Sequence, residues 1–116
     1  MATADLTVIG LGRDDPSASH YIAEIQRRLA AQDRVGYRLH AMGTSLEGET
    51  RDILEVVGEL HAVPFELGLP RVYTVLKLDE RRDRAQTLED KVASVERLLD
   101  EGPSHEGRVA HPAVAG

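Results

Sequence analysis

Apolar residues alternate with polar ones along four short segments of the chain and recur every three or four positions along three longer ones. The alternation predicts strands at 6–12, at 71–79 and on either side of Met42-Gly43. Helical spacing begins near residues 17, 49 and 87. The order is therefore β-α-β-β-α-β followed by a C-terminal helix. This pattern predicts an α+β, ferredoxin-like fold with a four-stranded antiparallel sheet.

Local signals mark the expected ends of the helices. Ser17 or Ser19 is expected to cap the first helix. Pro64 lacks a backbone donor, so the second helix should kink or end near His61. The segment 87–90 (TLED) is typical of a capping box in an acidic variant and predicts the start of the third helix.

Chain length and composition indicate one globular domain. We assign residues 1–100 to it and expect the tail, residues 101–116, to be disordered because it is rich in Gly, Pro, Ser and His without periodicity. The formal charge of −6 and the lack of a basic stripe argue against nucleic-acid binding. No cysteine, membrane-length apolar run or signal peptide is present, so we expect a cytoplasmic protein without membrane contact.

The segment 37–49 is predicted to form a β-hairpin. We place its two-residue turn at Met42-Gly43, where glycine supplies the positive φ of a tight turn. One side of this hairpin is then apolar and the other carries a carboxylate, an imidazole and a hydroxyl. The expected cross-strand pairs are Leu39 with Leu46, Arg38 with Glu47, and His40 with Ser45.

The sheet face without helices is predicted to be partly apolar. Ile9, Leu11, Tyr73 and Val75 all point to that face in the predicted alternation. Exposed apolar area of this kind is unfavourable in water. We therefore expect a homo-oligomer, a dimer or a dimer of dimers, in which a second subunit covers this face.

Two residues of the hairpin are candidates for chemistry. Glu47 either holds a cationic or amidine-like ligand or forms a cross-strand ion pair with Arg38. His40 beside Ser45 suggests acid–base or nucleophilic work, but the hairpin supplies no acidic partner to orient the imidazole. His20, His40 and His61 lack metal-ligand spacing. We therefore predict neither catalytic residues nor a metal site.

Three motifs together resemble a known family. Residues 42–49 (MGTSLEGE) resemble the MGT-x-(I/L)-EGE segment of the small thiamine-binding proteins. Residues 19–23 (SHYIA) are similar to their S-x-Y-V-A helix start, and residues 71–83 to their RV-x-T-x-IKIDDRRD ending. The likeness runs in order from about residue 5 to residue 98. Ala41, where relatives often have Pro, and Pro64, in a helix that is usually uninterrupted, depart from the pattern.

The resemblance implies a ferredoxin-like fold that assembles through its sheets into dimers and tetramers. It also implies non-catalytic binding of thiamine or its hydroxymethylpyrimidine precursor as a small-molecule ligand, for a carrier, a buffer or a sensor, without a further cofactor. Carried over by motif, the expected ligand-binding residues are Glu47, Thr44, Ser19, Tyr21, Met42 and His40.

Two other functions stay open from the sequence. One is a cofactor-independent enzyme of the dimeric α+β-barrel kind that uses His40. The other is a purely structural or regulatory assembly module, in which the partner subunit fills the open sheet face.

Overall fold

The protein is a four-stranded antiparallel sheet with helices on one face. The computed structural model describes residues 1–12, 18–83 and 87–101. The strand order is β2-β3-β1-β4, which is the predicted ferredoxin-like topology. The elements in chain order are β1 (Ala2–Leu11), α1 (Ala18–Ala30), β2 (Gly36–His40), β3 (Gly43–Gly48), α2 (Thr50–His61), α3 (Val63–Glu66), β4 (Arg71–Glu80) and α4 (Leu88–Glu101).

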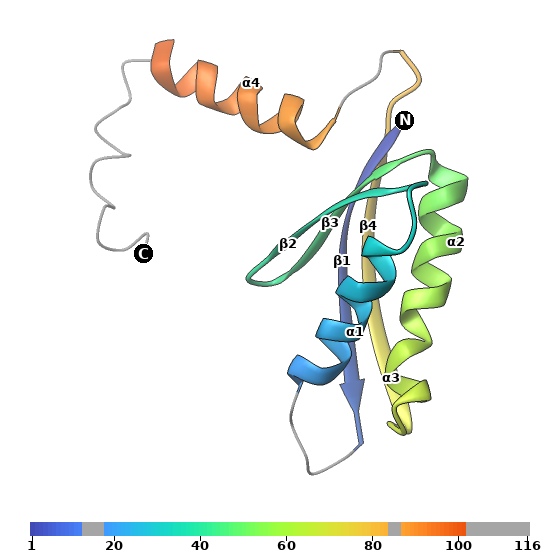
Figure 1. Cartoon of the computed structure of the whole chain (residues 1–116). Helices are drawn as coiled ribbons and strands as arrows, with labels where there is room; N and C mark the ends of the chain where they lie inside the picture. Colours follow the sequence, from blue (N-terminus) through green and yellow to red (C-terminus); the bar gives the residue numbers. More distant parts are fainter. Residues whose placement is uncertain (13–17, 84–86, 102–116) are drawn as a thin grey trace, which may run out of the picture.

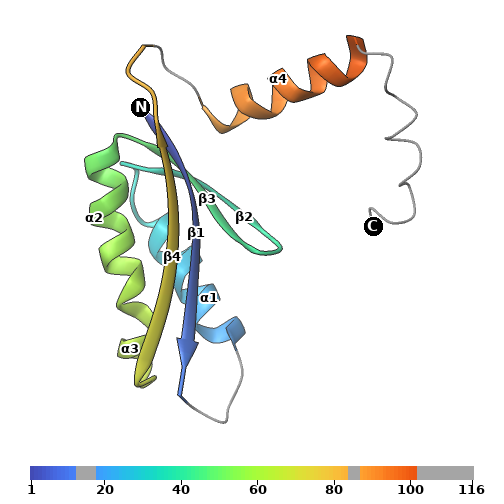
Figure 2. The same ribbon diagram turned by 180° about the vertical axis from the view of Figure 1, so that it is seen from behind.

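The core lies between the sheet and helices α1, α2 and α3 (Figure 1). Alternate residues of β1 point into it, and the helices contribute their apolar stripes. Figure 2 shows the opposite face, where β1 and β4 lie in front of α1. Among the described residues, the largest fully buried side chains are Leu6, Leu29, Leu46, Ile53, Leu60, Val63 and Pro64.

The helix ends follow local chemistry. Helix α2 ends at His61, and Pro64 stands in the first turn of the short α3, as the missing donor of proline predicts. The N–H of Asp90 donates to Thr87 Oγ1 at 3.1 Å, and the N–H of Thr87 donates to Asp90 Oδ2 at 3.0 Å, so the predicted capping box is confirmed. Helix α1 begins at Ala18, which places Ser19 inside the helix rather than at its cap. Ser17 lies outside the described residues.

The predicted register of the hairpin is wrong by two residues. The loop is Ala41-Met42 instead of Met42-Gly43, and Gly43 is the first residue of β3. A shift by two keeps every side chain on its predicted face, because side chains alternate with period two. The cross-strand partners nevertheless change: Leu39 pairs with Thr44, Arg38 with Ser45, His40 with Gly43, and Gly36 with Glu47.

Gly43 is required for a different reason from the one the sequence suggested. Its φ is not positive, so it does not supply a left-handed turn residue. A Cβ at this position would collide with the carbonyl oxygen of Leu6 and lie 3.0 Å from Thr7 Oγ1. The glycine therefore allows the hairpin to approach β1 closely.

The sheet face without α1–α3 keeps the apolar residues that the alternation predicted. Ile9 pairs with Tyr73 and Thr7 with Val75, so these side chains share one face, and Tyr73 is 56% exposed. Helix α4 extends away from the end of the sheet in Figure 1 and has no buried residue. It includes Glu101, the first residue of the predicted tail, and residues 102–116 lie outside the described residues.

Candidate functional site

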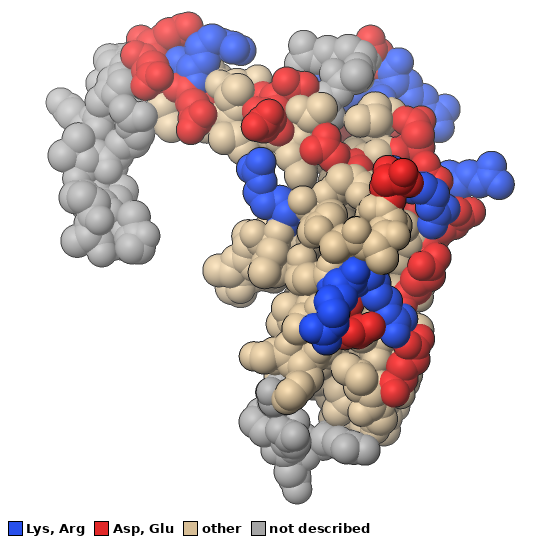
Figure 3. Space-filling view, viewed as in Figure 1, with Lys and Arg blue, Asp and Glu red and all other residues tan. Residues whose placement is uncertain are grey.

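A cavity of about 190 Å³ lies between the hairpin tip, β1 and α1. It forms where β3 begins beside the middle of β1, while α1 covers the gap from the core side. Figure 3 shows that the hairpin tip on this side carries no charged surface. Fourteen residues line the cavity: Leu6, Thr7, Val8, Ile9, Tyr21, Ile22, Ile25, Gln26, Leu39, His40, Ala41, Met42, Gly43 and Thr44.

Most of the cavity wall is apolar. Leu6, Tyr21 and Ile25 are buried and form its floor, because they belong to the inward stripes of β1 and α1. Met42 stands at the mouth and is 80% exposed. An aromatic ring and aliphatic side chains around a small opening suit a flat, partly apolar ligand.

Two hydrogen bonds place polar groups in this wall. Gln26 Nε2 donates to Thr44 Oγ1 at 3.1 Å, which joins α1 to the buried side of β3. Thr44 is 5% exposed, so its hydroxyl depends on this contact and on any ligand. Thr7 Oγ1 donates to the carbonyl oxygen of Met42 at 3.1 Å and holds the hairpin tip against β1.

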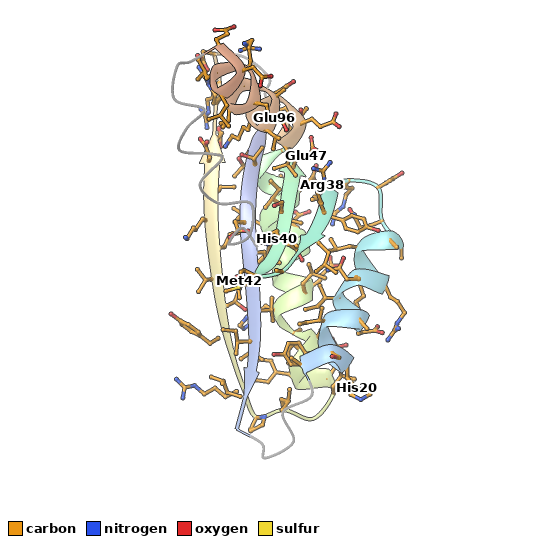
Figure 4. The ribbon with its side chains drawn as sticks, turned by 90° about the vertical axis from the view of Figure 1, so that its left-hand side faces the viewer. His20, Arg38, His40, Met42, Glu47 and Glu96 are labelled. Carbon is orange, nitrogen blue, oxygen red and sulfur yellow. The ribbon has the colours of Figure 1, made fainter. Side chains whose placement is uncertain are left out.

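His40 lies at the rim of the cavity and has a defined orientation. Its Nε2 is 2.8 Å from Asp5 Oδ1 on β1, and its Nδ1 accepts the Met42 N–H at 3.3 Å. Because Nδ1 accepts, these contacts match an imidazole that carries a proton on Nε2 and donates it to the carboxylate. In Figure 4, His40 lies on β2 between the hairpin tip, marked by Met42, and the labelled residues Arg38 and Glu47 further along the hairpin.

Two carboxyl groups with a lowered pKa lie outside the cavity. Hydrogen bonds from Arg27 and then Arg28 lower the pKa of Glu24 on α1. A hydrogen bond from Thr50 and then one from Arg82 lower the pKa of Glu80 at the end of β4. Neither carboxyl group lines the cavity, whose polar groups are mostly hydroxyl, amide and imidazole. Such a lining is better suited to hydrogen bonding than to charge compensation.

The cavity brings together four of the six predicted ligand-binding residues. Thr44, Tyr21, Met42 and His40 line it. Ser19 is exposed in the first turn of α1 and is not part of the lining. Glu47 lies on the open sheet face, beside Gly36 and Thr3, and is not part of it either. Within the described residues no ion pair joins Glu47 to Arg38, because the corrected register places Arg38 opposite Ser45.

Sequence reasoning missed three residues of this region. Asp5 and Thr7 lie on the same face of β1 as Thr3 and Ile9, and only the pairing of β3 with β1 brings the hairpin next to them. Gln26 follows Ile25 on the apolar stripe of α1, and a polar residue at such a position is a signal for a buried hydrogen bond.

A second hollow, of about 410 Å³, lies on the open face near α4. Its lining includes Asp5, Ser45, Lys77, Asp79 and Lys91, and Lys91 Nζ is paired with Asp79 at 2.6 Å. No group of three or more potential metal ligands occurs in residues 1–12, 18–83 and 87–101. The helices in those ranges are too short or too polar to cross a membrane.

Comparison with known proteins gives the same family along most of the chain. The family model described as thiamine-binding protein matches residues 4–96. A UPF0045 protein of Staphylococcus xylosus is 45% identical over 105 residues, which cover 88% of this chain and 98% of the relative. The UPF0045 protein YqgV of Bacillus subtilis is 42% identical over 102 residues, covering 85% of this chain and 98% of the relative.

Solved structures confirm the fold. A hypothetical protein of Methanocaldococcus jannaschii superposes with a TM-score of 0.74 at 32% identity, covering 84% of this chain and 97% of the other. A Thermotoga maritima protein, provisionally assigned to thiamine biosynthesis or salvage, has a TM-score of 0.68 at 21% identity and covers 81% and 97%. The second likeness supports the fold alone. Because the family model matches residues 4–96 of this chain and two relatives are more than 40% identical to it, the chain belongs to the thiamine-binding protein family.

Proposed function

We propose that this protein binds thiamine or a related aminopyrimidine, without transforming it, in the cavity between α1, β1 and the hairpin tip. A carrier, a buffer or a sensor would each use such a site. The observation that carries the proposal is that the hairpin motif of the family, through Met42, Gly43 and Thr44, lines a small apolar cavity with an ordered amide–hydroxyl pair.

The chemistry of the lining suits the two rings of thiamine. The aminopyrimidine needs a flat apolar slot with donors and acceptors at its edge, and Tyr21, Thr44 and Gln26 provide these groups. The thiazolium carries a permanent positive charge. At the rim, Asp5 behind His40 places a carboxylate near the mouth, and the chain as a whole carries a formal charge of −6.

Titration calorimetry with thiamine, its phosphates and hydroxymethylpyrimidine tests this proposal. We expect saturable binding by the full chain to at least one of these compounds. Thr44→Val keeps the shape of the side chain but removes the hydroxyl, and should weaken binding by about 0.5–1.5 kcal/mol, roughly 2- to 12-fold. An absence of saturation at millimolar concentrations would refute the proposed function.

Glu47 distinguishes the cavity from the open sheet face as the location of the ligand. Because Glu47 is outside the cavity, Glu47→Gln should leave the affinity within about twofold of wild type. A loss of about 1–3 kcal/mol would instead indicate a ligand held by this carboxylate on the open face.

We further propose that the open sheet face is the contact between copies of this chain. Support comes from the apolar residues Ile9, Tyr73 and Val75 on the open face of β1 and β4. Further exposed apolar residues lie on α4: Val92, Val95 and Leu98 are 49%, 57% and 65% exposed. Tyr73→Glu should shift the mass measured by light scattering toward the monomer. Leu54→Glu is the matched control, because Leu54 is 51% exposed on α2, away from that face. Equal masses for both variants and wild type would contradict this contact.

One observation favours an enzyme as the second candidate. His40 has the acidic partner that the hairpin alone lacked, since Asp5 lies 2.8 Å from its Nε2, and it lines the cavity. Turnover of a bound pyrimidine that is lost in His40→Ala, with folding intact, would support this candidate over simple binding. Thiamine recovered unchanged after prolonged incubation with wild type would argue against it.

A further inference from the structure

Strand β1 is paired along its whole length on one side but only along its first half on the other. The pairs with β4 run from Ala2 to Leu11. The pairs with β3 stop at Leu6, opposite Thr44. Residues 7–11 therefore have a neighbouring strand on one side only, and the cavity lies along the start of the unpaired side.

The position of Leu6 establishes which backbone groups face that side. Its carbonyl oxygen points to β3, because a Cβ on Gly43 would collide with it. The N–H and C=O groups of successive strand residues point to opposite sides, so those of Val8 and Gly10 also point away from β4. Of these two residues, only Val8 lines the cavity.

The turn prevents the ladder from continuing to Val8. The next residue in line is Met42, whose carbonyl oxygen accepts from Thr7 Oγ1 at 3.1 Å and whose N–H donates to His40 Nδ1 at 3.3 Å. Both backbone groups of Met42 are therefore already engaged. Outside the strand ladders, no backbone hydrogen bond between described residues involves Val8. A donor and an acceptor on one residue thus face an apolar cavity, where a ligand that pairs with both would be favoured.

We propose that the main chain of Val8 recognises the ligand, with its N–H donating to a pyrimidine ring nitrogen and its C=O accepting from the adjacent exocyclic amino group. The ligand takes the place of the missing β3 residue, as an added strand would. This inference rests on the proposed function and adds the chemical class: a heteroaromatic ring with an amino donor next to a ring-nitrogen acceptor. Tyr21 and Ile25 of α1, which line the same cavity, would contact its faces.

Amide hydrogen exchange by NMR on the ¹⁵N-labelled full chain tests the assignment, with hydroxymethylpyrimidine as the probe. The Val8 amide should exchange at least about tenfold more slowly at saturation and shift downfield, because it gains a hydrogen bond. The amides of Thr7 and Ile9 point to β4 and serve as internal controls. Their exchange should change less than that of Val8.

A ligand analogue provides the second measurement. Replacing the exocyclic amino group with hydrogen removes the donor without adding bulk, and should weaken binding at least about tenfold. Saturable binding of the probe with unchanged Val8 exchange, or equal affinity for the two compounds, would overturn the main-chain recognition while leaving the proposed function intact. No saturable binding at all would overturn both.

Discussion

The substitution Gly43→Ala gives a stringent test of how the hairpin is seated against β1. The new Cβ would collide with the Leu6 carbonyl oxygen, lie 3.3 Å from the Leu6 carbonyl carbon and 3.0 Å from Thr7 Oγ1. β1 cannot move aside easily, because it is paired with β4 along its whole length. Overpacking of this kind costs about 1–3 kcal/mol. Displacing Thr7 from its hydrogen bond to Met42 adds about 1 kcal/mol.

The free energy of unfolding of Gly43→Ala should therefore fall by about 2–4 kcal/mol, which for a domain of roughly 100 residues lowers Tm by at least about 8 °C. Gly58→Ala is the matched control: no atom lies within 4 Å of its added Cβ, and it lies inside α2. This control should be more stable than wild type by about 0.5–1 kcal/mol. Urea denaturation at one protomer concentration measures both variants. Equal stability of Gly43→Ala and wild type would refute the close approach of the hairpin to β1.

Two further predictions concern α1. Gln26→Ala removes the donor to the buried Thr44 hydroxyl and should lower the free energy of unfolding by about 1–3 kcal/mol, measured by urea denaturation; a neutral result would mean that this bond is not formed. Hydrogen bonds from Arg27 and then Arg28 lower the pKa of Glu24 in the folded protein. The ionised carboxylate therefore stabilises the fold at pH values above the ordinary pKa of 4.5, and this contribution is lost as the pH falls through the lowered folded-state pKa. Glu24→Gln should therefore be less sensitive to acid over that range in denaturation series, and an identical acid profile would contradict the shift.

The order of the elements and the faces of their side chains could be predicted from the sequence, because both follow from the periodicity of the apolar residues. Alternation placed Tyr73 and Val75 on the open face, and Pro64 ended α2 at His61 by removing a backbone donor. The register of the hairpin could not be predicted in the same way. Moving the pairing by two residues preserves all faces, so the pattern of apolar residues does not distinguish the two registers.

The turn was misplaced because one glycine has two possible roles. Glycine in a hairpin usually supplies positive φ, whereas Gly43 is needed for close approach to Leu6. That contact joins residues far apart in the chain, and so does the pair of His40 and Asp5. The sequence motif pointed to Thr44 and Met42, which line the cavity in the structure. Gln26 comes from another element, and only the packing of α1 brings it there.

A crystal structure of the full chain grown with thiamine tests the proposed location of the ligand most directly. We expect the pyrimidine ring in the cavity, against Tyr21 and within hydrogen-bond distance of the Val8 main chain and the Thr44 hydroxyl. Thiamine bound instead on the open sheet face beside Glu47, with the cavity occupied by protein or water alone, would contradict it.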